Sequence, residues 1–198
     1  MVRGDRWWRH YGPHIVTDFQ PGQVREEQTC PVEVGRVISY GTSSAGYDLR
    51  LWDGALQRLD RYGPDREIDP KRFERRQLAD VPLKQFAGGD YYLMPEYSYA
   101  LGATLETITI PRDHLGLVVG KSTYARCGLI VNTTPLEPGW TGQLVLELHN
   151  ATPLPLRVYA REGIAQLLML PIDMTPEVTY ADRNGKYQGQ TGITTARV

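Results

Sequence analysis

One glutamate in the chain has the chemistry to activate a water molecule. Glu147 lies in the run QLVLELHN (143–150), where apolar and other residues alternate. Successive side chains of a β-strand point to opposite faces, so Leu144, Leu146 and Leu148 share one face and Glu147 lies on the other. A lone glutamate on such a face usually points to solvent. It becomes a candidate general base if it faces a cleft with a partner that keeps it ionised.

The loop 120–128, with sequence GKSTYARCG, can supply that partner. The Lys121 ammonium would supply a compact positive charge, the planar Arg126 guanidinium could donate two parallel hydrogen bonds, and the Ser122 hydroxyl could rotate to donate another. Together these groups suit the binding of an anion. The glycine spacing differs from that of a P-loop. Alone, the loop is weak evidence, because surface loops often carry such residues.

The segment 42–49, TSSAGYDL, is ambiguous in the same way. Its small residues and Gly46 permit either a tight turn or the close approach of a ligand. A plain turn before a strand is the commoner explanation.

The elements that must position these residues are predicted to be mostly strands. From residue 90 onward, short apolar or alternating runs are cut by Gly, Pro and Asn, and none has a sustained helical period. This pattern is typical of a β-barrel or sandwich. The predicted strands are 32–40, 97–110, 115–119, 129–131, 143–149, 156–159 and 164–170, and residues 3–11 are expected to form a short helix.

We expect a single domain over residues 1–198 with two less regular parts. In 53–89, basic and acidic residues are interleaved, which usually marks a solvated excursion and not a nucleic-acid surface. The tail 180–198 is polar and is expected to be mobile.

Composition excludes several partners. The net charge is −1, so no overall basic field exists to hold a nucleic acid polymer or an anionic membrane, although a small anion needs only a few local cations. No apolar run is long enough to cross a bilayer. The charged N-terminus lacks the apolar stretch of a signal peptide, so a cytoplasmic location is expected.

Four segments in order resemble the dUTPase and dCTP deaminase superfamily. They are SSAGYDL (43–49), GKSTYARCG (120–128), EPGWTGQLVLE (137–147) and YADRNGKYQGQTG (180–192), and the likeness runs from about Phe19 to the end of the chain. The resemblance implies a mainly β protein, a distorted β-barrel of the dUTPase-like type with a few short helices. It also implies a homotrimer with active sites between subunits, magnesium on the triphosphate, and dTTP as an inhibitor.

Two positions favour a deaminase within this superfamily. Glu147 stands where dCTP deaminases carry their catalytic glutamate and dUTPases usually have an apolar residue. Glu137 stands where dUTPases carry their water-activating aspartate. The resemblance therefore implies hydrolytic deamination of dCTP to dUTP and ammonia, which supplies dUTP for dUMP and thymidylate synthesis.

Three alternatives stay open: a bifunctional enzyme that gives dUMP and pyrophosphate, a dUTPase, and a non-catalytic nucleotide-binding regulator. The intact set of Ser122, Arg126 and Glu147 argues against the regulator, because a protein that only binds has no need of it.

The resemblance assigns roles residue by residue. Glu147 would be the general base, Ser122 and Arg126 would hold the water, and Arg126 would favour ionised Glu147 through its charge. The expected dCTP-binding residues are Lys121, Ser122, Thr123, Tyr124, Ala125, Arg126, Val145, Leu146, Glu147, Gln166, Tyr180, Lys186 and Gln190.

Zinc is the usual alternative for activating water in nucleobase deaminases, which carry His-x-Glu paired with Pro-Cys-x-x-Cys. Neither motif occurs in the chain. We therefore expect a zinc-independent enzyme, with Mg²⁺ bound through the nucleotide triphosphate and no metal ligands from protein side chains.

Overall fold

A computed structural model describes residues 1–30, 33–60 and 67–198. The chain starts with helix α1 (Asp5–Tyr11) and the short 3-10 helix η1 (Gly12–His14). Trp8 of α1 is fully buried, and its ring lies 5.6 Å from that of Tyr47. The expected N-terminal helix is therefore present and is anchored to the core by its aromatic side chain.

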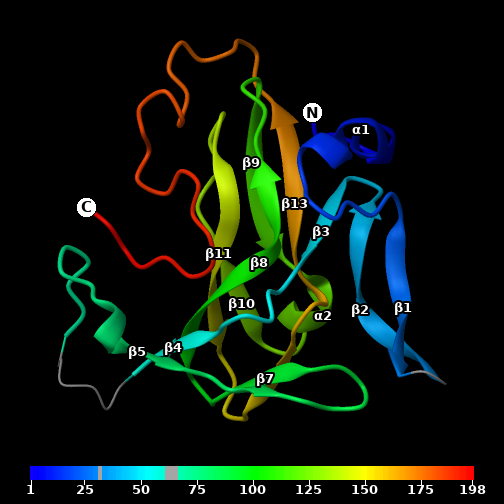
Figure 1. The fold of residues 1–198 in the computed structure, drawn as a ribbon, viewed down its shortest axis with the longest axis vertical. Helices are drawn as coiled ribbons and strands as arrows, with labels where there is room; N and C mark the ends of the chain where they lie inside the picture. The colour runs from blue at the N-terminus through cyan, green and yellow to red at the C-terminus, as the bar shows by residue number, and fades with distance from the viewer. Residues whose placement is uncertain (31–32, 61–66) are drawn as a thin grey trace.

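The first sheet has five strands in the order β1-β2-β3-β13-β9. Its strands are β1 (Gln23–Cys30), β2 (Glu33–Ser43), β3 (Gly46–Arg50), β13 (Gly163–Pro171) and β9 (His114–Gly120). The β1–β2 hairpin extends away from the rest of the molecule (Figure 1). β3 begins at Gly46. A Cβ at this position would lie 2.8 Å from the Leu167 carbonyl oxygen, so glycine permits the close approach of β3 to β13.

The second sheet carries Glu147. Its order is β10-β11-β8-β4-β5, with β10 (Leu129–Asn132), β11 (Thr141–Asn150), β8 (Tyr99–Thr109), β4 (Gln57–Leu59) and β5 (Leu78–Asp80). A third sheet has the order β12-β7-β6, with β12 (Leu156–Tyr159), β7 (Tyr91–Met94) and β6 (Leu83–Lys84). Two further short helices are η2 (Arg75–Gln77) and α2 (Ser122–Ala125).

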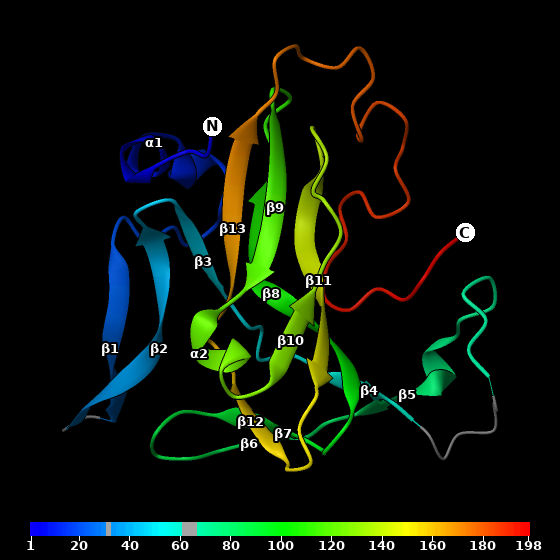
Figure 2. The same ribbon diagram turned by 180° about the vertical axis from the view of Figure 1, so that it is seen from behind.

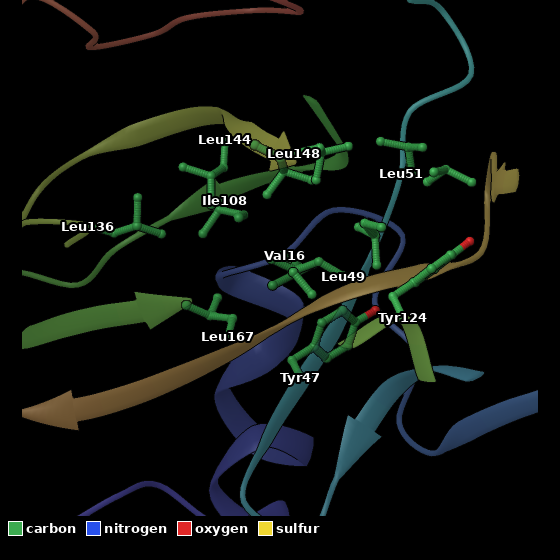
Figure 3. Packing of buried hydrophobic residues seen from close by; sticks show 14 of the residues in the cluster. Val16, Tyr47, Leu49, Leu51, Ile108, Tyr124, Leu136, Leu144, Leu148 and Leu167 are labelled. Carbon is green, nitrogen blue, oxygen red and sulfur yellow. The ribbon is translucent and has the colours of Figure 1, made fainter. Parts of the chain in front are cut away.

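The core lies between the two larger sheets and is built from the apolar faces of their strands. Figure 3 shows Tyr47 and Leu49 of β3 facing Ile108 of β8 and Leu148 of β11. Arg50 of β3 and Glu106 of β8 join the same sheets by an ion pair of 2.7 Å, in which Glu106 is fully buried. Apolar packing and one buried ion pair therefore hold the sheets together.

The strands confirm a mainly β protein with few short helices, but their arrangement corrects the expected closed barrel. In the described part of the chain, β-pairing between the two larger sheets is limited to an isolated bridge of Leu51 with Thr104, and another isolated bridge pairs Gly116 of β9 with Leu136, which lies between β10 and β11. Pro111 follows β8 closely and Pro135 precedes Leu136. Proline has no N–H to donate, so ladder pairing does not continue at these points.

The tail and the part of the excursion that contains η2 and β5 lie on one side of the molecule, away from the β1–β2 hairpin (Figures 1 and 2). The tail follows β13 and passes beside β11, and the excursion contains η2 between β4 and β5. Among the described residues, no helix is long and apolar enough to span a membrane.

Candidate active site

Glu147 lies in the middle of its sheet, on the face opposite to the core. It is opposite Asn132 of β10 on one side and Leu101 of β8 on the other. Along β11, buried and half-buried residues alternate, with Leu144, Leu146 and Leu148 inward. The predicted alternation is confirmed, and it places Glu147 with Gln143, Val145 and His149.

The carboxyl group of Glu147 is poised for proton transfer. Its Oε2 atom is buried and has no hydrogen-bond partner. Burial raises the pKa of Glu147 from 4.5 to about 7, although its own backbone and the Asn132 side chain lower it by hydrogen bonding. A carboxyl with this pKa can both accept and return a proton near neutral pH.

Glu147 opens into a pocket of about 1050 Å³. The pocket also contains Val145, Tyr180, Lys186 and Gln190 from the expected binding set, together with Glu137. Apolar side chains from three parts of the chain form much of its wall: Leu59, Ile68, Pro70, Phe73, Leu101, Leu136, Trp140 and Leu144. An acid, cations and an apolar wall therefore share one cavity.

The tail reaches this pocket by pairing with the start of β11. Gln143 N donates to Gln190 O at 2.9 Å, and Gln190 Nε2 donates back to Gln143 O at 2.9 Å. At Gly142 a Cβ would lie 2.9 Å from Gln190 O, so only glycine allows the tail to come so close. Trp140 Nε1 donates to Tyr187 O at 3.0 Å.

Two ion pairs fix the first part of the tail. Arg112 Nη2 lies 2.8 Å from Asp182 Oδ2, and Arg183 Nη2 lies 2.5 Å from Glu137 Oε1. The Arg183 guanidinium also lies over the Tyr180 ring, 5.1 Å from its centre. The Lys186 ammonium donates to Arg197 O at 2.7 Å, so the chain end folds back over it. Tyr180 and Lys186 thus have defined positions in the pocket.

The loop 120–128 is ordered by contacts with β3. Lys121 Nζ lies 2.5 Å from Asp48 Oδ2, which also accepts from Gln23 Nε2 at 2.9 Å. The Tyr124 side chain is buried and its hydroxyl accepts from Tyr159 N at 2.8 Å. Because Tyr124 anchors α2, the side chains of Ser122 and Arg126 are left exposed at the surface.

The other expected residues of this region are placed as follows. Gln166 of β13 donates to Ser43 Oγ at 2.8 Å, beside the small-residue loop. Thr123 and Ala125 are exposed on α2, whereas Leu146 is fully buried on the core face of β11. β10 ends opposite Glu147, so within the described residues no strand covers this edge of β11 at 144–146.

The structure therefore divides the expected site into two groups. Val145, Glu147, Tyr180, Lys186 and Gln190 line the pocket; Lys121, Ser122, Thr123, Tyr124, Ala125, Arg126 and Gln166 do not, nor does Leu146. Within the described residues, no hydrogen bond or ion pair joins Glu147 to Ser122 or Arg126. Within one chain, the pocket residues and the residues of the loop 120–128 therefore lie in separate places.

Several residues that contact Glu147 or line its pocket were missed from the sequence. Asn132 is found only through the register of β10 and β11, which joins residues fifteen positions apart. Tyr99 lines the pocket, and the charge of Glu147 contributes to its raised pKa after the larger effect of burial. Ile68 and Phe73 were overlooked because the surrounding charges indicated a solvated loop. No group of three or more His, Cys, Asp or Glu in the described ranges could hold a metal ion.

Comparisons with known proteins agree with this architecture. A family profile described as dCTP deaminase-like matches residues 17–171. The dCTP deaminase of Halorhodospira halophila is 46% identical, covering 99% of this chain and 98% of the relative. That of Xylella fastidiosa strain M12 is 44% identical over the same shares. The chain belongs to the dCTP deaminase-like family.

A solved structure shares the fold. The crystal structure of 2'-deoxycytidine 5'-triphosphate deaminase from Agrobacterium tumefaciens matches with a TM-score of 0.55 and 18% identity. The match covers 85% of this chain and 47% of that one.

Proposed function

We propose that this protein catalyses the hydrolytic deamination of dCTP to dUTP and ammonia. The observation that carries the proposal is Glu147, whose buried, unpartnered Oε2 belongs to a carboxyl with a pKa of about 7 in the wall of a nucleotide-sized pocket. Two full-length relatives at 46% and 44% identity bear the name dCTP deaminase.

Glu147 can perform every proton transfer of this reaction. As a carboxylate it takes a proton from water, and the hydroxide adds to C4 of the cytosine while the proton passes to N3. Glu147 then takes the proton of the new C4 hydroxyl and delivers it to the amine. Ammonia leaves, and C4 becomes the carbonyl of uracil. A single acid–base group near neutral pKa suits both directions.

The second half of the site would come from a neighbouring subunit of a homotrimer. Ser122 and Arg126 are exposed and stand apart from the Glu147 pocket within one chain. Assembly as a dUTPase-like trimer would bring these two side chains to Glu147 of the next subunit. Ser122 and Arg126 would hold the water, and the guanidinium would favour ionised Glu147.

Mixing two inactive variants tests this arrangement. Glu147→Gln and Arg126→Ala subunits, unfolded and reassembled together, should regain activity, because some sites receive Glu147 from one subunit and Arg126 from another. Random trimers would restore about a quarter of the sites. No regained activity, or an active monomer in light scattering, would place the whole site in one chain.

The triphosphate would be held by the loop and the tail together. Lys121, Ser122, Thr123 and Arg126 would bind from the loop side with Gln166, and Tyr180, Lys186 and Gln190 from the tail side. Mg²⁺ would bind phosphate oxygens and neutralise part of their charge. The tail would close over the nucleotide and exclude water. dTTP would compete for the same site, and its effect on the initial rate checks this.

We expect dUTP to accumulate as the product. Cleavage to dUMP needs a second carboxylate to activate water, and the candidate, Glu137, is paired with Arg183 at 2.5 Å. Glutamate is also one methylene longer than aspartate, and misplacement by about 1 Å can cost on the order of a hundredfold in rate.

The decisive assay incubates the protein with dCTP, and separately with dUTP, in the presence of magnesium. dUTP and ammonia should appear from dCTP, and dUTP should stay intact. Unchanged dCTP would reject the deaminase. Stoichiometric dUMP and pyrophosphate from either substrate would establish the bifunctional or dUTPase alternative instead.

A further inference from the structure

Part of the charged excursion lies against the pocket that holds Glu147. Ile68, Pro70 and Phe73 line this pocket. We propose that they form the wall that contacts the nucleoside part of the substrate, with Phe73 as a specificity-determining residue. This inference rests on the function proposed above and adds a binding element that the four sequence motifs do not contain.

The segment that carries Phe73 is anchored on its C-terminal side. β4 pairs with β8 and with β5, and Asp60 N donates to Gln77 O at 2.9 Å. Directly after Phe73, η2 begins with a capping box in which Glu74 and Gln77 exchange hydrogen bonds between side chain and backbone. Phe73 lies outside the helices and strands but directly precedes this capped 3-10 helix, which anchors the chain beside it.

The exposure of the side chains around Phe73 indicates a surface that can contact a ligand. Phe73 is half-buried, whereas the neighbouring Arg72 side chain is 86% exposed and that of Glu74 is 58% exposed. Ile68 is 59% exposed although it is a large apolar residue. In this stretch Arg72 and Glu74 thus turn their charges to solvent, while Ile68 and Phe73 line the pocket.

The distribution of charge in the pocket identifies the occupant. Lys186 and Arg183, the latter paired with Glu137, place cations on the tail side, Glu147 supplies the acid, and the excursion supplies apolar and aromatic surface. A nucleoside triphosphate has the complementary parts: an anionic chain for the cations and a flat base with its sugar for the apolar wall. Aromatic side chains bind bases in this way because every base has a stacking face.

The experiment compares Phe73→Ala with Phe86→Ala. Phe86 lies in the same excursion and is 51% exposed, but it contacts Tyr91 and Arg157 and does not line the pocket. The measurements are the KM and kcat for dCTP and the inhibition constant of inorganic tripolyphosphate. Phe73→Ala should raise the KM for dCTP roughly tenfold and leave tripolyphosphate inhibition unchanged. Phe86→Ala should match the wild type in all three.

Equal KM values for the two variants would overturn the inference. It would also be overturned if Phe73→Ala raised the KM for dCTP and the inhibition constant of tripolyphosphate by the same factor. If Phe73→Ala does not fold, Ile68→Ser applies the same test at an exposed position, with the same expected and contrary results. If the wild-type protein does not deaminate dCTP, the proposed function itself is rejected. This outcome is distinct from an active wild type whose KM is insensitive to Phe73→Ala, which would reject only the proposed nucleoside contact.

Discussion

Replacing Glu147 by glutamine should stabilise the folded chain while it removes the activity. Glutamine keeps the shape of the side chain but carries no charge, so it avoids the cost of ionising a buried carboxyl. In the folded chain the pKa of Glu147 is about 7, against 4.5 ordinarily. At about 1.4 kcal/mol per pH unit, this difference corresponds to at most about 3 kcal/mol.

The measured gain should be smaller than that limit. Glu147 is only partly buried, so solvent screens part of the cost, and Arg126 of a neighbouring subunit would offset a further part. We therefore expect about 1–2 kcal/mol, or a rise of roughly 3–6 °C in Tm.

The sign depends on pH. Unfolded Glu147 ionises near 4.5 but the folded chain keeps the proton up to about 7, so wild-type stability falls as the pH rises between these values. The advantage of Glu147→Gln should be present at pH 8 and absent at pH 4.5. Urea unfolding at equal protomer concentration measures it, since an oligomer's stability depends on concentration.

Glu137→Gln is the matched control. The Glu137 side chain is 41% exposed and paired with Arg183, so its replacement should bring no gain at pH 8. The reasoning fails if Glu147→Gln is no more stable than the wild type at pH 8, or if it gains equally at both pH values. Deamination within about tenfold of the wild type would also show that Glu147 is not the base.

Three further results are expected. Arg112→Ala, which removes an anchor of the tail, and truncation after Val178, which removes the tail itself, should both raise the KM for dCTP. The far-UV circular dichroism should be retained in both variants. An unchanged KM would show that the tail is not part of the site. A zinc-selective chelator should leave the rate intact and magnesium removal should raise the KM, whereas stoichiometric zinc lost together with activity would contradict a carboxylate mechanism. The kcat/KM for dCTP should decrease as the pH drops below a midpoint between pH 4.5 and about 7, since Glu147 must be ionised to accept a proton. Asn132→Ala should move this midpoint to higher pH. A shift to lower pH would show that Asn132 does not stabilise the carboxylate.

Local pattern was sufficient for several strands of the second half of the chain and for the face of Glu147, but it missed β1, β4, β5, β6 and β7. The alternation in 143–150 depends only on the period of a β-strand, and β11 has it over Thr141–Asn150. The predicted strand at 156–159 coincides with β12, and that at 164–170 lies within β13. These elements were predictable because each is encoded by neighbouring residues.

Contacts between distant segments were not predictable in the same way. Lys121 and Asp48 are separated by 73 positions, and their ion pair depends on how β3 and β9 flank β13. The apolar residues of the excursion were hidden by the many charges around Phe73. The expected barrel assumed continuous pairing, which the single bridge between Gly116 and Leu136 does not provide.

The ion pair between Lys121 and Asp48 would also affect how tightly the proposed anion site binds. A flexible loop must lose conformational freedom when it grips a ligand, and each immobilised long side chain costs about 0.5–1.5 kcal/mol. Here Asp48, whose carboxylate also accepts a hydrogen bond from Gln23, already holds the ammonium group, and Tyr124 fixes the helical turn that follows. The loop therefore loses this conformational freedom during folding, so a phosphate bound there as proposed above would meet a preorganised loop, and more of its contact energy would appear as affinity.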